Sequence, residues 1–165
     1  MKTLLLVRHA KSSRDDPSLE DRDRPLNDRG RHDAPMMGKR LSARGAKPER
    51  LLSSPALRAL TTAKLVADEV GYKRHDIVVD DRLYASSEAD LLALIRSLDA
   101  RLDCVMLVGH NPEFAGVARR LSSTIVDMPT CAVAEFSFDT TDWSDVGRRA
   151  PTRVVQDRPK APTSD

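Results

Sequence analysis

The chain has 165 residues, of which 40% are hydrophobic and 32% charged, and its formal net charge is +2. This length suits one domain with a full core, while the small, mixed charge argues against a nucleic-acid partner. The apolar runs fall far short of the ~20 residues that cross a bilayer, and the N-terminal run is too short for a signal peptide. We therefore expect a cytoplasmic protein with no nucleic-acid or membrane partner, in which Cys104 and Cys131 are small core residues.

Predicted strands and helices alternate along the chain. In chain order they are a strand at 3–8, a charged loop at 12–26, a helix at 27–43, a strand at 50–53, a helix at 56–70, a strand at 77–79, a helix at 88–100, a strand at 104–108, a helix at 112–121 and strands at 132–138 and 153–155. Pro35 lies inside the first helix, which is expected to kink or to begin late. The alternation predicts a three-layer α/β/α sandwich with a mostly parallel central sheet, in a single domain at residues 1–156 followed by a flexible tail at 157–165.

Two of the predicted strands end in a histidine. The first strand runs into Arg8 and His9, and the strand at 104–108 runs through Gly109 into His110. A histidine in isolation is more often an ordinary loop or core residue. In an open α/β sheet, however, chemistry lies just beyond the carboxyl ends of the strands. The two strand ends therefore suggest one site built from both histidines.

A third segment brings a second arginine toward the same edge. The strand at 50–53 is followed by Ser54 and by a helix whose first turn holds Arg58. The start of a helix offers free N–H groups and the positive end of its dipole, which suit an anion. Arg8 and Arg58 add two planar guanidinium groups, each able to bind a tetrahedral anion through two hydrogen bonds. Because arginine does not ligate metals and repels cations, these residues predict a phosphate pocket and not a metal site.

Several short motifs stand in an order that resembles a known family. They are Arg8-His9, Ser54-x-x-x-Arg58-Ala59-x-x-Thr62-Ala63, Gly109-His110, Arg24-Pro25-Leu26-Asn27-Asp28-Arg29-Gly30 and Leu83-Tyr84-Ala85. Over about residues 2–140 the chain resembles the histidine phosphatase (phosphoglycerate mutase-like) superfamily, and within it the SixA-type phosphohistidine phosphatases. The family pattern has glycine after the catalytic Arg-His pair. This chain has Ala10 there, which would make the pocket slightly narrower.

The resemblance implies a metal-independent phosphatase that needs no cofactor. His9 would attack phosphorus and form a phosphohistidine intermediate, while Arg8, Arg58 and His110 would hold the phosphoryl oxygens. The residues themselves set one condition, because His9 must be unprotonated to attack, and the neighbouring arginines disfavour a third positive charge. The candidate substrate-binding residues are Lys11, Ser54, Asn111 and Glu88.

Many members of this superfamily supply a carboxylic acid that protonates an alcohol leaving group, and the corresponding stretch here is 80–90. Glu88 and Asp81 are the candidates for this acid. The simpler interpretation is that Glu88 is a carboxylate at the start of a helix and Asp81 a turn residue, neither of them catalytic. An alcohol leaves poorly without a proton, whereas a protonated imidazole leaves easily. We therefore expect phosphohistidine, on a signalling or phosphotransfer protein, to be the substrate.

Two alternatives remain open. One is a small-molecule phosphomonoester phosphatase of the same fold, and the other is a non-catalytic phosphoprotein-binding module that keeps the arginines. Little chain is left for a lid between Arg58 and His110, which predicts an open cleft. The loop Ser12–Arg24 alternates acidic and basic residues. It is most simply a solvated loop, and the sharper hypothesis is that it docks a phosphoprotein beside the cleft.

Overall fold

A computed structural model of the protein describes residues 1–159. Six strands form one sheet in the order β3-β2-β4-β1-β5-β6. Their bounds are β1 Lys2–Arg8, β2 Arg50–Ser53, β3 Val78–Val79, β4 Cys104–Gly109, β5 Val133–Phe138 and β6 Arg153–Asp157. β1 pairs with β4, and β2 with both β3 and β4, in parallel, while β5 pairs antiparallel with β1 and β6. The expected mostly parallel sheet is confirmed.

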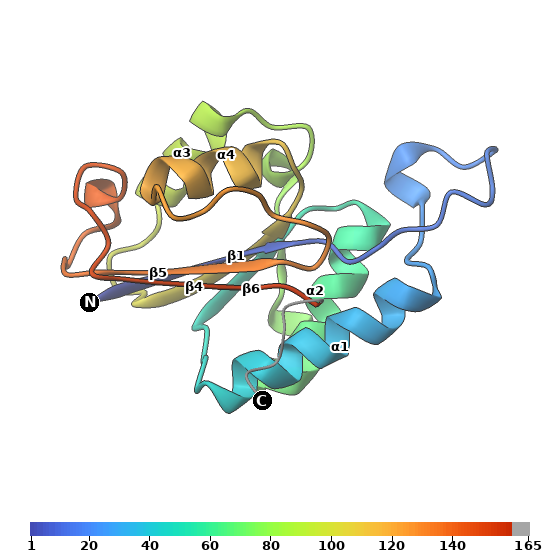
Figure 1. The fold of residues 1–165 in the computed structure, drawn as a ribbon, viewed down its shortest axis with the longest axis horizontal. Coiled ribbons are helices and arrows are strands. Elements are labelled where there is room, and N and C mark those ends of the chain that lie inside the picture. The colour runs from blue at the N-terminus through green and yellow to red at the C-terminus, as the bar shows by residue number, and fades with distance from the viewer. Residues whose placement is uncertain (160–165) are drawn as a thin grey trace.

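Helices cover both faces of this sheet (Figure 1). α1 (Asp28–Ala43) and α2 (Leu57–Val70) pack on one face, and α3 (Glu88–Arg96) and α4 (Glu113–Leu121) pack on the other. β1 shows why two layers are needed, because its side chains alternate between the faces. Leu4 and Leu6 join the core under α3 and α4, whereas Leu5 and Val7 join the core under α1 and α2. The predicted three-layer sandwich is thus confirmed.

Local signals set most of the helix ends. The Asn27 side chain accepts a hydrogen bond from the Gly30 N–H and so caps α1, and Gly71, with φ of 76°, ends α2 in the left-handed region. The expectation that Pro35 delays the helix is wrong, since α1 begins at Asp28 and continues through Pro35. The buried packing of α1 against α2 outweighs the one hydrogen bond that a proline removes.

Two further expectations concern the ends of the chain and its cysteines. The last strand runs to Asp157, and Arg40 of α1 donates to both the Asp157 carboxylate and the Arg158 carbonyl. The rest of the expected tail, residues 160–165, lies outside the described residues.

Cys131 is buried and Cys104 half-buried, and both are free thiols. Over residues 1–159, none of the helices has the length and apolar character that crossing a membrane requires.

Candidate active site

The two strand-end histidines lie side by side. β1 and β4 are adjacent and in register, with Arg8 opposite Gly109, so His9 and His110 leave the sheet at the same edge. The His9 N–H donates to the Gly109 carbonyl at 2.9 Å. The centroids of the two imidazole rings are 5.2 Å apart, with their planes inclined at 54°. The structure therefore brings together the two side chains that the sequence predicted for one site.

Helices from one face of the sheet hold the segment that follows His9. The Ala10 N–H donates to the Thr62 hydroxyl of α2 at 2.9 Å. The Lys11 carbonyl accepts from the Asn27 N–H at 3.0 Å, just before α1 begins. Gly30, in the first turn of α1, packs so tightly on this carbonyl that a side chain at position 30 would clash with it. The backbone around His9 is therefore fixed by contacts distant in sequence.

The hydrogen bonds of His9 define its tautomer. Its Nδ1 lies 2.7 Å from the Ala10 carbonyl oxygen. Because a carbonyl can only accept, Nδ1 carries the proton and Nε2 keeps its lone pair. The pKa of His9 is lowered to about 3, mainly by burial; the Ala10 hydrogen bond opposes this shift, and repulsion from His110, Arg58 and Arg8 adds to it. The arginines do disfavour a protonated His9, as expected, but burial is the larger cause.

His110 is held between a hydroxyl and a guanidinium. Its Nε2 lies 2.8 Å from Ser54 Oγ, and its Nδ1 lies 3.5 Å from Nη2 of Arg58. Since a guanidinium only donates, Nδ1 is the accepting nitrogen and Nε2–H donates to Ser54. Burial, followed by repulsion from Arg58, lowers the pKa of His110 to about 4. Ser54, expected to bind substrate, is fully buried, and its hydroxyl accepts from both His110 and the Ala56 N–H, the latter at 3.2 Å.

Two buried guanidinium N–H groups lack partners at this edge. Arg8 donates through Nη1 to the Met128 carbonyl at 3.1 Å, and Arg58 donates through Nη1 and Nη2 to Asp21 at 2.7 and 3.0 Å. Among the described residues, nothing accepts a hydrogen bond from Nε of either arginine. A buried donor without a partner is costly. A bound anion would remove that cost.

His9 and His110 line a cavity of about 460 Å³. Its charged lining comprises four arginines and two carboxyl groups, which are Arg8, Arg14, Arg24, Arg58, Asp21 and Glu113. Neither Arg14 nor Arg24 is among the predicted site residues, although Arg24 belongs to the Arg24-Pro25-Leu26 motif. An isolated bridge between Ser12 and Leu26 folds the loop back and brings Arg24 to the cavity. The excess of arginine suits an anionic ligand.

The remaining sequence candidates have different surroundings. Asn111 lines the cavity while its amide bonds the Met128 carbonyl at 2.8 Å and the Ala115 N–H at 3.2 Å. Lys11 lines a neighbouring hollow of about 420 Å³, which Arg8 and His9 also border. Glu88 does not line the cavity, because its side chain packs against Gly116 of α4. Asp81, also outside the cavity lining, is exposed and lies 4.0 Å from Arg22.

Two further cavity residues, Asp21 and Tyr84, were not predicted as site residues, although Tyr84 belongs to the Leu83-Tyr84-Ala85 motif. The Tyr84 hydroxyl donates to Asp21 Oδ2 at 2.6 Å, and the Tyr84 ring meets His110 edge-on with centroids 5.6 Å apart. This hydrogen bond, together with the one that Arg58 Nη2 donates to the same oxygen, holds the pKa of the Asp21 carboxyl well below its usual range. Asp21 therefore stays ionised and fixes the Arg58 guanidinium beside His110.

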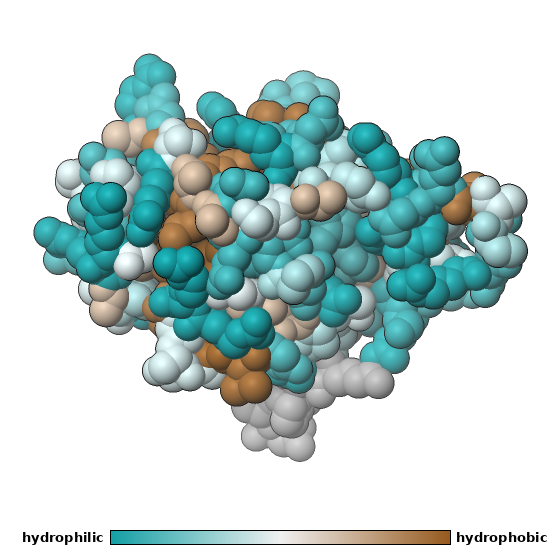
Figure 2. Space-filling view, turned by 90° about the horizontal axis from the view of Figure 1, so that it is seen from above, coloured by the Kyte–Doolittle hydropathy of each residue, from teal (hydrophilic) through white to brown (hydrophobic). Residues whose placement is uncertain are grey.

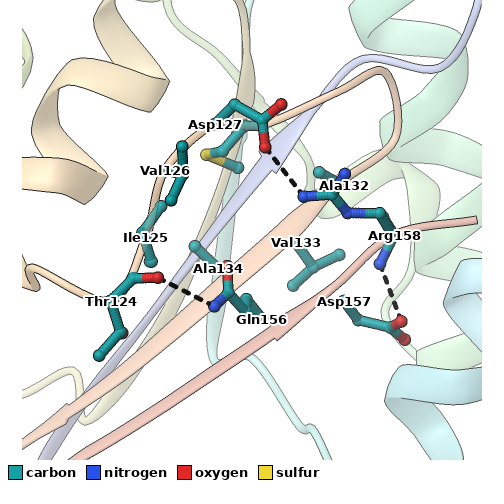
Figure 3. A pocket seen from close by; sticks show the side chains of 11 residues that line it. Thr124, Ile125, Val126, Asp127, Ala132, Val133, Ala134, Gln156, Asp157 and Arg158 are labelled. Carbon is teal, nitrogen blue, oxygen red and sulfur yellow. Dashed lines mark hydrogen bonds and ion pairs between the residues drawn. The ribbon is translucent and has the colours of Figure 1, made fainter. Parts of the chain in front are cut away.

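Another hollow, of about 210 Å³, lies where residues 124–128 pass over β5 and β6 (Figure 3). The polar side chains at its rim are engaged with their own neighbours. Gln156 donates to the Thr124 carbonyl at 3.3 Å, and Arg158 bonds Asp127 at 2.8 Å. It therefore lacks the convergent donors of the histidine cavity.

Known proteins share both the sequence pattern and the fold. The model of the histidine phosphatase superfamily (branch 1) matches residues 4–87. An uncharacterised chloroplastic protein of Arabidopsis thaliana is 31% identical over 150 residues, which are 86% of this chain and 69% of that protein. An uncharacterised protein of Mycobacterium tuberculosis is 30% identical over 129 residues, 78% of this chain and 77% of that one.

Solved structures extend the likeness to the whole fold. A candidate phosphohistidine phosphatase SixA from Agrobacterium tumefaciens is 28% identical with a TM-score of 0.75, covering 82% of this chain and 90% of that chain. The protein histidine phosphatase SixA in complex with tungstate has a TM-score of 0.80 at 24% identity, covering 95% and 97% of the two chains. A mycobacterial glucosyl-3-phosphoglycerate phosphatase has a TM-score of 0.65 at 19% identity, covering 95% and 97%.

Proposed function

Since the chain belongs to the histidine phosphatase superfamily and is a histidine-type phosphatase, we propose that it works through His9 without a metal ion and removes the phosphoryl group of phosphohistidine from a signalling or phosphotransfer protein. The observation that carries this proposal is the state of His9. Its imidazole is neutral, its Nε2 accepts no hydrogen bond from residues 1–159, and it borders a cavity lined by arginines. A nucleophile aimed at a phosphoryl dianion needs these three properties.

The proposed reaction has two displacements. In the first, His9 Nε2 forms a bond to phosphorus while the bond to the leaving group breaks; in the second, water attacks the phosphohistidine and releases inorganic phosphate. Arg8 and Arg58 bind the phosphoryl oxygens and offset their charge in both transition states. The dianion raises the pKa of His110, which then takes up a proton from solvent and hydrogen-bonds a phosphoryl oxygen that stays on phosphorus. The arginines supply the positive charge that a metal ion supplies in other phosphatases.

The choice of phosphohistidine rests on the leaving group and on access. An imidazole that carries a proton leaves readily, so phosphoramidates place the lowest demand on this site. The cavity is open to the surface beside the loop Ser12–Arg24, so a phosphorylated side chain of another protein fits the approach. The likeness to a SixA chain at 28% identity supports the same substrate class. A small-molecule phosphatase is the second candidate, because the fold is shared with a glucosyl-3-phosphoglycerate phosphatase.

The test compares the wild type with His9→Ala on a protein phosphorylated on histidine, on a small phosphoramidate and on a panel of small phosphomonoesters. We expect His9→Ala to abolish turnover and the trapping of a phosphorylated enzyme, because no other group attacks phosphorus. His32→Ala, at an exposed position of α1, is the control and keeps full activity. A His9→Ala enzyme that works at the full rate would remove His9 from its role. Comparable rates on phosphoramidates and serine phosphate in the wild type would contradict the substrate class.

A further inference from the structure

Glu113 opens α4 and lines the cavity together with both histidines. Only 4% of the residue is exposed. Its Oε2 accepts a hydrogen bond from the Ser86 N–H at 3.1 Å, whereas its Oε1 is buried and has no hydrogen-bond partner among the described residues. An ionised carboxylate with a buried, unpaired oxygen is costly, and a proton on that oxygen relieves most of the cost. The geometry therefore favours a protonated carboxyl group in the wall of the cavity.

The surroundings of Glu113 act on its pKa in the same direction. Burial raises the pKa of Glu113, although its own backbone N–H and that of Ser86 favour the ionised form. Asp21, the other cavity carboxyl, has its pKa lowered by hydrogen bonds from Tyr84 and Arg58. The pKa values of the two carboxyl groups in this cavity are therefore shifted in opposite directions. This arrangement is typical of sites in which one carboxyl group acts as an acid and the other stays ionised.

Glu113 also lies beside the stretch that corresponds to the acid-bearing segment of many superfamily members. That stretch is 80–90, and its two candidates, Asp81 and Glu88, do not line the cavity. The Glu113 carboxyl reaches the same stretch from another helix through its hydrogen bond with Ser86. A carboxyl group is thus present at this edge of the cavity, although it comes from α4.

We propose that Glu113 is a further catalytic residue, the proton donor to an oxygen leaving group, and that it extends the substrates of this site from phosphoramidates to phosphate monoesters of alcohols. The proposal rests on the proposed function, because the donor serves a reaction in which His9 attacks phosphorus. It gives this enzyme a slower second activity on alkyl esters beside the faster one on phosphoramidates.

The proton balance is complete within the site. As His9 Nε2 bonds to phosphorus and the P–O bond breaks, the leaving oxygen takes the Glu113 proton, giving an alcohol and a Glu113 carboxylate. Water then attacks the phosphohistidine, and Glu113 removes a proton from it as the N–P bond breaks. The products are inorganic phosphate, neutral His9 and a protonated Glu113, so the cycle needs no other reactant.

The experiment varies the leaving group in wild type and Glu113→Gln. The substrates are a phosphoramidate, p-nitrophenyl phosphate, whose phenolate leaves without a proton, and phosphoserine, whose alkoxide does not. We expect Glu113→Gln to lose about 10²- to 10⁴-fold in kcat/KM on phosphoserine and to keep its kcat/KM on the other two, because kcat/KM reports the step that forms the phosphohistidine. The glutamine oxygen still accepts from the Ser86 N–H, so the loop stays anchored. In the wild type, kcat/KM on phosphoserine falls as pH rises through the pKa of Glu113, and this limb disappears in the variant.

A matched control is Glu49→Gln. Glu49 also accepts from backbone N–H groups, those of Asp103 and Cys104 at 2.7 and 3.1 Å, but at the opposite end of β4. This variant keeps its rates on all three substrates. An equal loss on all substrates in Glu113→Gln, or no loss on phosphoserine, overturns the proton-donor role, as does a wild type with no activity on phosphoserine. Failure of the proposed function is seen separately, as an unchanged phosphoramidate rate in His9→Ala.

Discussion

At the scale of single residues, Arg58 is the side chain on which the most contacts of the site converge. Its guanidinium bonds Asp21 through two nitrogens and lies 3.5 Å from Nδ1 of His110. A lysine keeps the charge but cannot make this set of directed bonds. We expect Arg58→Lys to lower kcat/KM on a phosphoramidate by about 10²- to 10³-fold, the usual effect of losing one donor to a transition-state oxygen.

The measurement pairs steady-state kinetics with the affinity for inorganic phosphate as a competitive inhibitor, which should weaken in parallel. Arg74→Lys serves as the control, because Arg74 is exposed and pairs with Asp68 at 2.6 Å away from the cavity. A normal rate in Arg58→Lys would show that charge alone suffices at this position and that the directed bonds are irrelevant.

The sequence revealed His9 and His110 but not Glu113, and the difference has a physical cause. A histidine that follows a buried strand is placed by the sheet, and parallel pairing brings two such strand ends to one edge. An acidic residue in the first turn of a helix is ordinary, since it complements the helix dipole. Only the tertiary packing of Ser86 over α4 buries Glu113 and leaves one oxygen unpaired, and no local pattern encodes that contact. Asp21 escaped prediction for the same reason.

At the scale of elements, the loop Ser12–Arg24 projects beyond the carboxyl end of β1 as the blue segment of Figure 1. The face drawn in Figure 2 is largely hydrophilic, and its apolar residues form patches separated by polar ones. The cavity is lined by charged side chains, so a phosphoprotein that reaches it meets charged groups. We expect the double reversal Glu20→Lys and Asp23→Lys, at two exposed positions, to change KM for a phosphoprotein several-fold and to leave the small phosphoramidate unaffected.

Kinetics at two salt concentrations check this prediction, because a contact between exposed charges weakens as salt screens it. The reversal Asp139→Lys, at an exposed position just after β5 and at the opposite edge of the sheet, controls for added positive charge far from the cavity, at half the charge change of the double reversal. If both substrates respond equally, the loop acts on the cavity itself; if neither responds, the loop does not dock the partner.

Strands and helices were more predictable from sequence than the contacts between them. β2 matches its expected bounds, Arg50–Ser53, because a short apolar run stands between clear breakers. α3 was expected to reach Ala100 but ends at Arg96, where Ser97 closes the last turn by donating its hydroxyl to the Leu94 carbonyl at 2.7 Å. The apolar periodicity of α3 continues to Leu98, so the pattern does not predict that the helix ends at Arg96.

At the scale of the whole molecule, the buried histidines couple the stability of the fold to pH. Burial lowers the pKa of His9 from 6.5 to about 3 and that of His110 from 6.5 to about 4. Between these values and 6.5 the unfolded chain binds more protons than the folded protein, so the free energy of unfolding rises with pH in that window. The stability from the two neutral rings is fully present above about pH 6.5 and is lost as pH falls through about 4 and then 3. Glu113, whose pKa is raised, acts in the opposite sense and partly offsets the loss.

We expect His9→Asn to reduce this slope by up to one proton, which is about 1.4 kcal/mol per pH unit. The measurement is urea unfolding of the wild type and the variant at several pH values between 4 and 6.5, with His32→Asn at the exposed start of α1 as the control for the substitution itself. An unchanged slope in His9→Asn would mean that His9 already takes up its proton in the folded protein. In that case the pKa of His9 would lie near 6.5, and activity would fall as pH drops through that value because a growing fraction of the Nε2 lone pairs would be protonated. The unfolding experiment therefore tests, without any substrate, the property of His9 on which the chemistry depends.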